Sequence, residues 1–526
     1  MKPLIKPVIL GLAILSTPGF QFRSFAQGSL TPSPGAPAPT FKTLTQIEPR
    51  TAITSTGATT ISTSGSYYLA NNITVSSGDA ITIAASNVTL DLNGFTISST
   101  ASPAAGTGIE VGNRTGVTIT NGNIVGGVTN SGTTFSGTGF INGIRNAFFT
   151  SVREIHISRI TVRGCLGEGI FLNDPFGRST VVDSCLVDIA GGTGIGAGHV
   201  TNSIAINCGF EGISASVASH CRGSSLGTGD GVSAGTADNC TGDSAGGSGV
   251  EATVVSNCSG SSASGNGIVA YVADNSYGGS TSGKGILTYS AANNCHASSS
   301  TGNGLETAIA RGCYGTSFNS TGVAATTAES CYGSSTDGGT GLSATNALNC
   351  QGSASGSGIG LSATTAGNCS GSSTGSGTGL FAIKTANSCQ GTSSIGTGLS
   401  VGDAGTVIGG TAINCHGTSG GRGLFAATAQ NCVGISTSIG VGLQANVASN
   451  SRGNAVNGTG LSANLAQNCY GYMTGSGTGL FATIAVGSYG QSTANGTGLN
   501  AEIANSSKGV SFSGIAISAT NKYDMP

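Results

Sequence analysis

A short unit that recurs about every 18 to 19 residues constrains this chain more than any other feature. One copy reads Gly-Thr-Gly-Leu-Phe-Ala at 377–382, followed by Ala-Asn-Ser-Cys-Gln-Gly at 386–391. A unit of this length cannot bury its own apolar side chains and must stack on its neighbours, so the repeat predicts a solenoid. The aliphatic position of the unit is occupied in turn by Ile170, Ile195, Ile213, Val232, Val250, Ile268, Ile286, Leu305, Val323, Leu342, Leu361, Leu380, Leu399, Leu424, Leu443, Leu461, Leu480 and Leu499.

Alternating apolar and polar residues predict that the units are built from strands. Residues 81–83, 88–92 and 117–120 alternate in this way, and Asn-Gly pairs at 93–94 and 121–122 mark turns. Hydrophobic residues make up 37% of the chain and recur periodically, and only 8% of the residues are charged. Disordered chains usually show the opposite balance, so the composition favours an ordered fold.

The same alternation predicts which side chains face the interior. Leu380 and Ala382 point one way and Phe381 the other, and Cys389 and Gly391 likewise share a face. Because Ser often replaces Phe at the position of Phe381, we assign Leu, Ala, Cys and Gly to the interior. The predicted core is narrow, with Gly where a Cβ atom would clash and with Asn, which tolerates turns, before many of the cysteines.

The N-terminus predicts export. A basic and then apolar stretch indicates a secretory signal peptide over residues 1–26, with an apolar run too short to span a bilayer. We predict a Pro- and Ser-rich linker at 27–42 and an N-terminal cap at 43–60. Wider, irregular coils are predicted for 61–190, and regular repeats with a C-terminal cap for 191–526. We expect a secreted, surface or periplasmic protein with no membrane span in its mature chain.

The chain has 15 cysteines, which in an exported protein would normally indicate disulfides. Cys313, Cys331 and Cys350 occupy one position of the unit, so on a solenoid they stack with parallel rather than converging side chains. Ser276 and Ser451 take the same position in other units. We therefore predict a column of reduced, buried thiols, with a few disulfides as the alternative. No C-x-x-C pair supports a zinc site.

Residues 66–69, 81–84 and 87–95 resemble the opening coils of secreted bacterial right-handed parallel β-helix repeat proteins, which share the pectate-lyase-like fold. The resemblance covers residues 43–126 and rests on the repeat pattern elsewhere. It implies a three-faced helix, and with the period it predicts an all-β, right-handed parallel β-helix with coils of about 18 to 19 residues in the C-terminal two-thirds. It does not imply lyase activity, because this fold also hosts binding and structural proteins.

Polysaccharide-cleaving β-helices need paired carboxylates, or a carboxylate-bound calcium ion with an Arg or Lys base. Asp183 and Asp188 differ by an odd number of positions, so one continuous strand would not place them on one face. No carboxylate matches the Asp-Asp, Gly-His-Gly and Arg-x-Lys set of pectin hydrolases, or the signature of calcium pectate lyases, so we assign no catalytic residue, metal or cofactor. The charged residues considered were Arg153, His156, Arg159, Arg163, Glu168, Asp174, Arg178, Asp183, Asp188 and His199.

The residue after the Cys position is predicted to face solvent, and aromatic residues are frequent there. A column of Tyr could stack on pyranose rings or contact a partner protein. Alternatively, Tyr is simply a favourable strand residue that packs on its neighbours. This position holds Tyr277, His296, Tyr314, Tyr332, Gln351, Gln390, His416, Arg452, Tyr470 and Tyr489. The candidate ligand-binding residues are Tyr277, Tyr314, Tyr332, Tyr470 and Tyr489.

We expect a non-catalytic β-helix that serves as an extracellular structural rod or binds polysaccharide or other cell-surface components. The alternative is a polysaccharide lyase or glycoside hydrolase of the pectate-lyase-like fold, which would use the charged coils between residues 145 and 199. A net charge of −2 gives no reason to expect a nucleic acid or an anionic membrane as partner.

Overall fold

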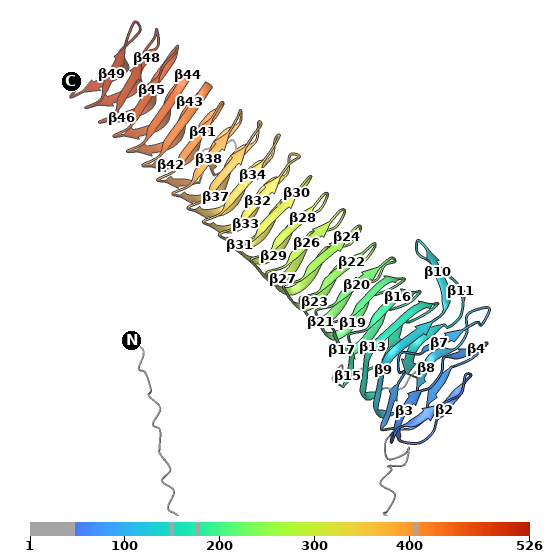
Figure 1. Cartoon of the computed structure of the whole chain (residues 1–526). Helices are drawn as coiled ribbons and strands as arrows, with labels where there is room; N and C mark the ends of the chain where they lie inside the picture. Colours follow the sequence, from blue (N-terminus) through green and yellow to red (C-terminus); the bar gives the residue numbers. More distant parts are fainter. Residues whose placement is uncertain (1–47, 147–151, 175–178, 403–408, 526) are drawn as a thin grey trace, which may run out of the picture. The chain divides into compact units, whose positions relative to one another are not determined.

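The structure is a computed structural model that describes residues 48–146, 152–174, 179–402 and 409–525. The predicted signal peptide and linker lie outside the described residues. Arg50–Pro526 forms one compact unit. Every regular element described is a β-strand, and all strands but two belong to one sheet. The unit is a parallel β-solenoid of about 24 turns (Figure 1), which confirms the predicted all-β fold.

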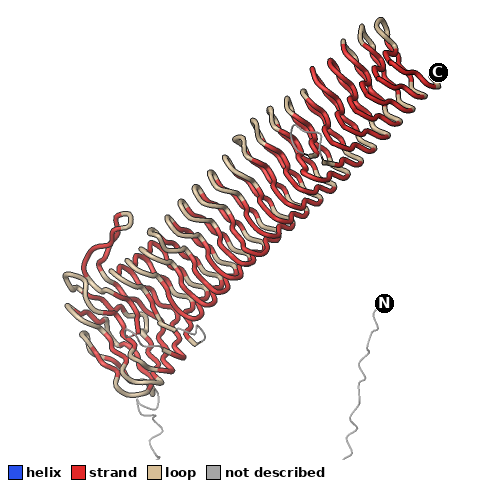
Figure 2. Tube along the Cα trace, turned by 180° about the vertical axis from the view of Figure 1, so that it is seen from behind, coloured by secondary structure: helices blue, strands red, loops and turns tan. Residues whose placement is uncertain are grey.

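Each regular coil contributes a long strand and a short strand, and each strand pairs in parallel with the equivalent strand of the next coil (Figure 2). The long strand β29 (Leu305–Arg311), for example, pairs with β31 (Val323–Glu329). The short strand β30 (Tyr314–Ser317) pairs with β32 (Tyr332–Ser335). Turns join the two kinds of strand within a coil.

The N-terminal coils are less regular and their strands vary in length. They contain β1 (Thr51–Ile53), β2 (Thr59–Ile61), β3 (Gly65–Leu69), β4 (Ile73–Val75), β5 (Ile81–Ile83), β6 (Val88–Asp91), β7 (Thr96–Ser99), β8 (Thr107–Val111), β9 (Thr115–Val125), β12 (Asn142–Asn146), β13 (Arg153–Cys165), β14 (Ile170–Phe171), β15 (Thr180–Asp183) and β16 (Leu186–Ala190). Strands β1 and β2, within the predicted cap, pair in parallel with β3 and β5.

The regular coils alternate the two kinds of strand. The other long strands are β17 (Ile195–Thr201), β19 (Ile213–Ser219), β21 (Val232–Asp238), β23 (Val250–Ser256), β25 (Ile268–Asp274), β27 (Ile286–Asn293), β33 (Thr340–Leu348), β35 (Ile359–Gly367), β37 (Thr378–Asn387), β42 (Arg422–Gln430), β46 (Gly477–Val486), β48 (Thr497–Asn505) and β50 (Ile517–Tyr523). In the coil between β37 and β42 the long strand is divided into β39 (Thr397–Val401) and β40 (Thr411–Ile413). The other short strands are β18 (Ile204–Cys208), β20 (Arg222–Ser225), β22 (Thr241–Ser244), β24 (Ser259–Ser262), β26 (Tyr277–Ser280), β28 (His296–Ser299), β34 (Gln351–Ala354), β36 (Ser370–Ser373), β38 (Gln390–Ser393), β41 (His416–Ser419), β45 (Tyr470–Met473), β47 (Tyr489–Ser492) and β49 (Lys508–Ser511). In β43 (Val433–Ser449) and β44 (Arg452–Gln467) a short strand runs on into the following long one.

The aliphatic column predicted from the repeat is confirmed. The register pairs Leu305 with Val323 and Val323 with Leu342, and every member of the column from Ile170 to Leu499 is fully buried. The inward positions of β29 pass from Leu305 and Thr307 to Ala310, so the alternation slips by one residue and the long strand bends. Two bent halves and one short strand give each coil three sides.

The interior is so narrow that the backbone of the short strand faces the backbone of the long strand. A Cβ atom on Gly315 would lie 2.3 Å from the carbonyl oxygen of Gly322 and 2.6 Å from Cγ2 of Val323. The predicted clash is therefore confirmed, and its cause is this approach across the coil. One coil accommodates a methyl group at this position, because the buried Ala297 is in register with Gly315.

A buried Ser ends most of the short strands, and in many of them its hydroxyl group closes the following turn. The hydroxyl of Ser317 donates to the carbonyl oxygen of Gly302 at 2.8 Å and accepts the N–H of Ser320 at 2.8 Å. The other corner of the coil uses a left-handed residue, and Asn takes this conformation more readily than most side chains. Asn257 and Asn368, each just before a cysteine, have φ angles of 53° and 52°.

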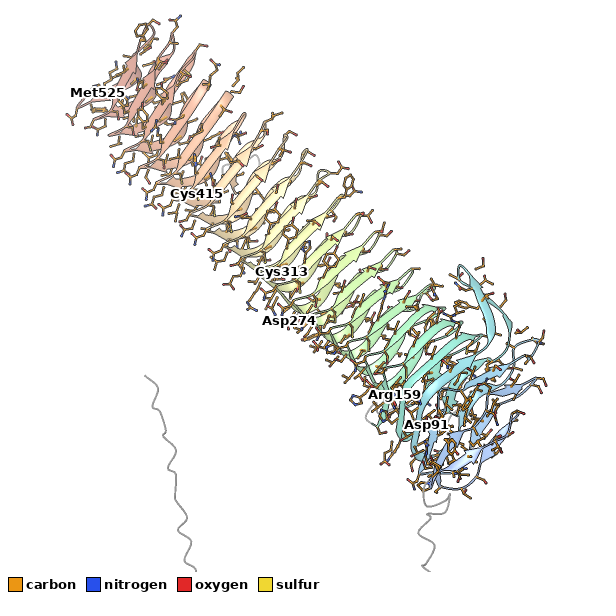
Figure 3. The ribbon with its side chains drawn as sticks, viewed as in Figure 1. Asp91, Arg159, Asp274, Cys313, Cys415 and Met525 are labelled. Atoms are coloured by element: carbon orange, nitrogen blue, oxygen red, sulfur yellow. The ribbon has the colours of Figure 1, made fainter. Side chains whose placement is uncertain are left out.

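All 15 cysteines are free and buried, which confirms the predicted reduced thiols. Thirteen of them share one column, in which Ser203, Ser276, Ser451, Ser488 and Ser507 take the remaining places. The thiol of Cys258 donates to the carbonyl oxygens of Ser256 at 3.1 Å and of Ala237, in the preceding coil, at 3.4 Å. A Ser hydroxyl can make the same bonds, which explains the exchange of the two residues. Figure 3 marks Cys313 and Cys415 along this column.

Two N-terminal features depart from a plain strand pattern. The Gly- and Thr-rich stretch after residue 126 forms an antiparallel hairpin of β10 (Gly127–Ser131) and β11 (Thr134–Thr138), which projects from the N-terminal coils (Figure 1). The run 153–163 lies in one strand, β13, but it bends at Arg159, which has a φ of 54°. The buried positions therefore shift from Ile157 to Ile160.

Candidate binding surface

The short strands place one outward side chain of each coil in a single column. This position follows the buried Cys or Ser, and the next residue, usually Gly, points inward, so the side chain must face solvent. We call this set the aromatic column, and its register gives Arg222, Thr241, Ser259, Tyr277, His296, Tyr314, Tyr332, Gln351, Ser370, Gln390, His416, Val433, Arg452, Tyr470, Tyr489 and Lys508. All five candidate tyrosines lie in it.

The rings of the aromatic column form two separate stacks. In the first stack, the centroids of Tyr277 and His296 are 5.3 Å apart and those of His296 and Tyr314 are 4.6 Å apart, with the rings tilted. Tyr314 and Tyr332 are parallel within 5° at 4.9 Å. The second stack contains Tyr470 and Tyr489, which are parallel within 4° at 5.3 Å.

This stacking closes most of the ring faces to a ligand. The faces of Tyr314 contact His296 on one side and Tyr332 on the other, so mainly the ring edge and the hydroxyl remain accessible. At the N-terminal end of the first stack, Tyr277 follows the small Ser259 in the register, and it is 45% exposed. Tyr277 therefore presents the accessible ring face at the N-terminal end of the first stack.

Two shallow hollows lie beside Tyr277 on the outer faces of β22, β24 and β26. The first, about 360 Å³, is lined by Thr241, Ser259, Tyr277 and His296, together with the turn residues Asn257 and Asn275. The second, about 580 Å³, is lined on the same strands by Asp243, Ser261 and Gly279. Hydroxyl, amide and carboxylate groups thus surround one open aromatic face.

The residue two places after each member of the aromatic column also faces outward, and sequence reasoning missed its role. In β22 this residue is Asp243, whose carboxylate accepts the hydroxyl of Ser261 and lies 3.6 Å from the guanidinium of Arg222. In β26 it is Gly279, and the absence of a side chain leaves room beside the Tyr277 ring. The recurring outward Ser and Thr of the Gly-[Ser/Thr]-Ser motif were the available signal.

Acidic side chains lie in three of the coils that precede the first stack. Burial, reinforced by the nearby Glu211 and Glu251, raises the pKa of Asp230 to about 6. Asp230 accepts the N–H of Ser248 at 2.7 Å. These three acidic residues lie just before or on the long strands β19, β21 and β23, whereas the aromatic column lies on the short strands.

The carboxylates considered for catalysis each have their own partner on separate elements. Asp183, on β15, accepts hydrogen bonds from Thr201 at 2.7 Å and Asn202 at 2.9 Å, and these bonds lower the pKa of its carboxyl group. Asp188, on β16, pairs with Arg163 at 2.9 Å. A left-handed turn at Ser184 separates the two strands, so these two carboxylates do not share one strand.

The other charged candidates are also engaged. Asp174 accepts the N–H groups of Ser179 and Thr180, and Glu168 pairs with Arg145 at 3.1 Å. Arg159 donates to the hydroxyl of Thr120 at 3.2 Å.

His156 and His199 are both in register with Val181, whereas Arg178 lies outside the described residues, and Arg153 opens β13 on the exposed side. These placements supply no carboxylate pair of the kind that glycoside cleavage requires.

Sequence reasoning did not single out Glu110. This half-buried residue is in register with Arg145, and burial together with the nearby Asp79 raises its pKa to about 7. The sequence indicates only that Glu110 lies in a strand in which apolar and polar residues alternate.

Comparison of the chain with protein-family models, curated proteins and solved structures gave no match. Over the part of the chain that the structure describes, no helix is long and apolar enough to cross a membrane. Within the same described residues, no three His, Cys, Asp or Glu side chains gather in a way that would hold a metal ion.

Proposed function

We propose that this protein is an exported, non-catalytic β-solenoid that binds neutral polysaccharide through the short-strand face at the N-terminal end of the first stack. One observation supports this most directly. The Tyr277 ring presents an accessible face beside hollows lined by Thr241, Ser259, Asn257 and Asp243. An aromatic face beside a few placed polar groups is the usual make-up of a small-molecule site.

The chemistry of this surface fits a pyranose ring. The apolar C–H side of the sugar packs on the Tyr277 face, while its hydroxyl groups exchange hydrogen bonds with Asn257, Ser259 and Asp243. The Asp243 carboxylate is a suitable acceptor for sugar hydroxyls, and its negative charge is balanced by Arg222 at 3.6 Å. Because the charged groups beside Tyr277 are paired with each other, the site has no excess charge to attract an anion, and a neutral glycan is the expected ligand.

The resemblance to secreted β-helix repeat proteins supports the export and the right-handed coil that belong to this proposal. The same resemblance keeps a polysaccharide lyase or glycoside hydrolase as the alternative function. The two differ in a simple readout, because a binding protein retains polysaccharide without releasing reducing ends.

The test is retention of the purified chain on a panel of insoluble neutral polysaccharides, with reducing sugar measured in the supernatant. Tyr277→Ala is expected to lower retention about tenfold, since an aromatic contact of this kind contributes roughly 1 to 1.5 kcal/mol. Tyr289→Ala is the matched control, because Tyr289 is 64% exposed but lies on the long strand β27.

Equal retention by wild type and Tyr277→Ala would refute the proposed site. Release of reducing sugar by the wild type would establish the alternative function. Circular dichroism of both variants checks that the solenoid is intact.

A further inference from the structure

The second stack differs from the first in its charge. The register places Arg452, Tyr470, Tyr489 and Lys508 in four successive coils, so a cation stands at each end of an aromatic pair. The guanidinium carbon of Arg452 lies 5.0 Å from the ring centroid of Tyr470. Cation–π contact of this kind orients the Arg side chain along the column.

Neither cation forms an ion pair with a described residue. Among the described residues, the ion pairs of the regular coils join Arg222 to Asp243, Lys284 to Glu306 and Arg311 to Glu329, and none includes Arg452 or Lys508. Arg452 uses its Nε–H to donate to Asn454 at 3.0 Å. An Arg fork can offer up to five N–H donors, so most of its capacity remains for a ligand.

Neighbouring side chains cover the ring faces of Tyr470, and this limits how a ligand can contact the second stack. Tyr470 contacts Arg452 on one face and Tyr489 on the other, and its hydroxyl donates to the side-chain oxygen of Gln491 at 2.8 Å. The nearby Tyr472 ring, 6.2 Å from Tyr470, widens the aromatic surface. A sugar ring cannot stack inside this column, so a ligand must interact with its cations and polar edges.

The distance between Arg452 and Lys508 favours an extended ligand over a small one. Arg452 and Lys508 are three coils apart, and coils of a parallel sheet repeat at about 4.8 Å, so the two positions are roughly 14 Å apart. A single small anion cannot reach both. A chain with anionic groups at intervals can contact both cations at once while it lies along the ring edges.

We infer that Arg452, Tyr470, Tyr489 and Lys508 form a binding site for a polyanionic polysaccharide that carries carboxylate or sulfate groups. The inference rests on the proposed glycan-binding function and adds a second specificity to it. The two stacks on this face would then bind different ligands. Neutral sugar would bind at Tyr277 beside Asp243, and anionic sugar would bind between Arg452 and Lys508. Arg–carboxylate and Arg–sulfate contacts are charge-assisted hydrogen bonds and give this second site its preference.

The test compares binding of polygalacturonate, dextran sulfate and uncharged dextran by affinity gel electrophoresis. The Arg452→Gln and Lys508→Gln double variant is expected to bind the two anionic polymers at least tenfold more weakly, with unchanged retention on the neutral panel. Lys384→Gln is the control, because Lys384 is an exposed lysine of the long strand β37. Arg452→Lys keeps the charge and is expected to retain part of the binding.

Each outcome has one meaning. Equal loss on carboxylate and sulfate polymers supports a site for anionic sugars in general, and loss on one alone identifies its anion. Unchanged anionic binding in the double variant, or displacement of the polymers by a DNA oligonucleotide of equal charge, overturns the inference. If neutral glycans are still retained through Tyr277, the proposed function survives that result; if no glycan of either kind is retained, both fail.

Discussion

Two adjacent glycines of β26 offer the sharpest test of how this solenoid is packed. A Cβ atom on Gly278 would lie 2.3 Å from the carbonyl oxygen of Gly285 and 2.4 Å from Cγ1 of Ile286. On Gly279 the nearest atoms would be Oγ of Ser298 at 3.5 Å and Cε1 of Tyr277 at 3.7 Å. Gly278→Ala therefore adds a methyl group against backbone, whereas Gly279→Ala adds one in ordinary contact.

The size of the effect follows from this geometry. Overpacking of a full core typically costs about 1–3 kcal/mol, and Ala297 in the same column shows that a coil can adjust to one methyl group. We expect Gly278→Ala to destabilise within that range. Gly279→Ala should change stability by less than about 1 kcal/mol, through the reduced freedom of the unfolded chain.

Hydrogen–deuterium exchange of peptides spanning β24 to β28 is the suitable assay, because each coil contacts mainly its neighbours and opens locally. A loss of about 1–3 kcal/mol corresponds to roughly 5- to 150-fold faster exchange in the Gly278→Ala variant. Equal protection in the two variants would refute the claim that the interior is closed by backbone contact.

Further predictions concern the titratable groups. No thiol is expected to react with an aromatic disulfide reagent in the native protein at pH 8, whereas all 15 should react in denaturant. Because burial raises the pKa of Cys185 and Cys208 to about 12 from 9.0, the stability linked to these thiols is present below pH 9 and is lost as the pH rises toward 12. Each contributes at most about 1.4 kcal/mol per pH unit there, which urea unfolding at pH 8 and pH 10 would detect. The raised pKa of Asp230 means that stability linked to this group falls as the pH rises from about 4 to about 6. Asp230→Asn should therefore stabilise the protein at pH 7.5, by on the order of 1 kcal/mol after allowance for solvent screening, and should leave stability unchanged at pH 4.

The regular coils could be predicted from the sequence because three positions of the unit recur with its period. The aliphatic residue, the Gly and the Cys recur with the period, and each has a single physical role, so Leu380, Gly391 and Cys389 all face the interior as expected. The bend of β13 at Arg159 could not be predicted, because an Arg in a left-handed conformation has no local sequence signal.

The binding surface was harder to predict than the core. The position of the tyrosines follows from alternation alone, but the orientation of their rings depends on neighbours about 18 residues away. The alternation of a strand predicts that a Tyr side chain is exposed, but it does not show that stacking on a neighbouring ring covers the faces of that Tyr ring. The hollow beside Tyr277 likewise arises because the two preceding coils carry only the small side chains of Ser259 and Thr241 at this position.

Because successive coils are stacked in matching register, the solenoid could become longer or shorter by whole coils. Tyr314 and Tyr332 are equivalent positions, and so are the residues around them, so excision of residues 315–332 would join two matching backbones and leave each remaining coil with a neighbour of the same kind. Gain or loss of whole units by unequal recombination would then lengthen or shorten the solenoid without a new fold. Each unit gained or lost between the two aromatic stacks would change the distance between them by one coil.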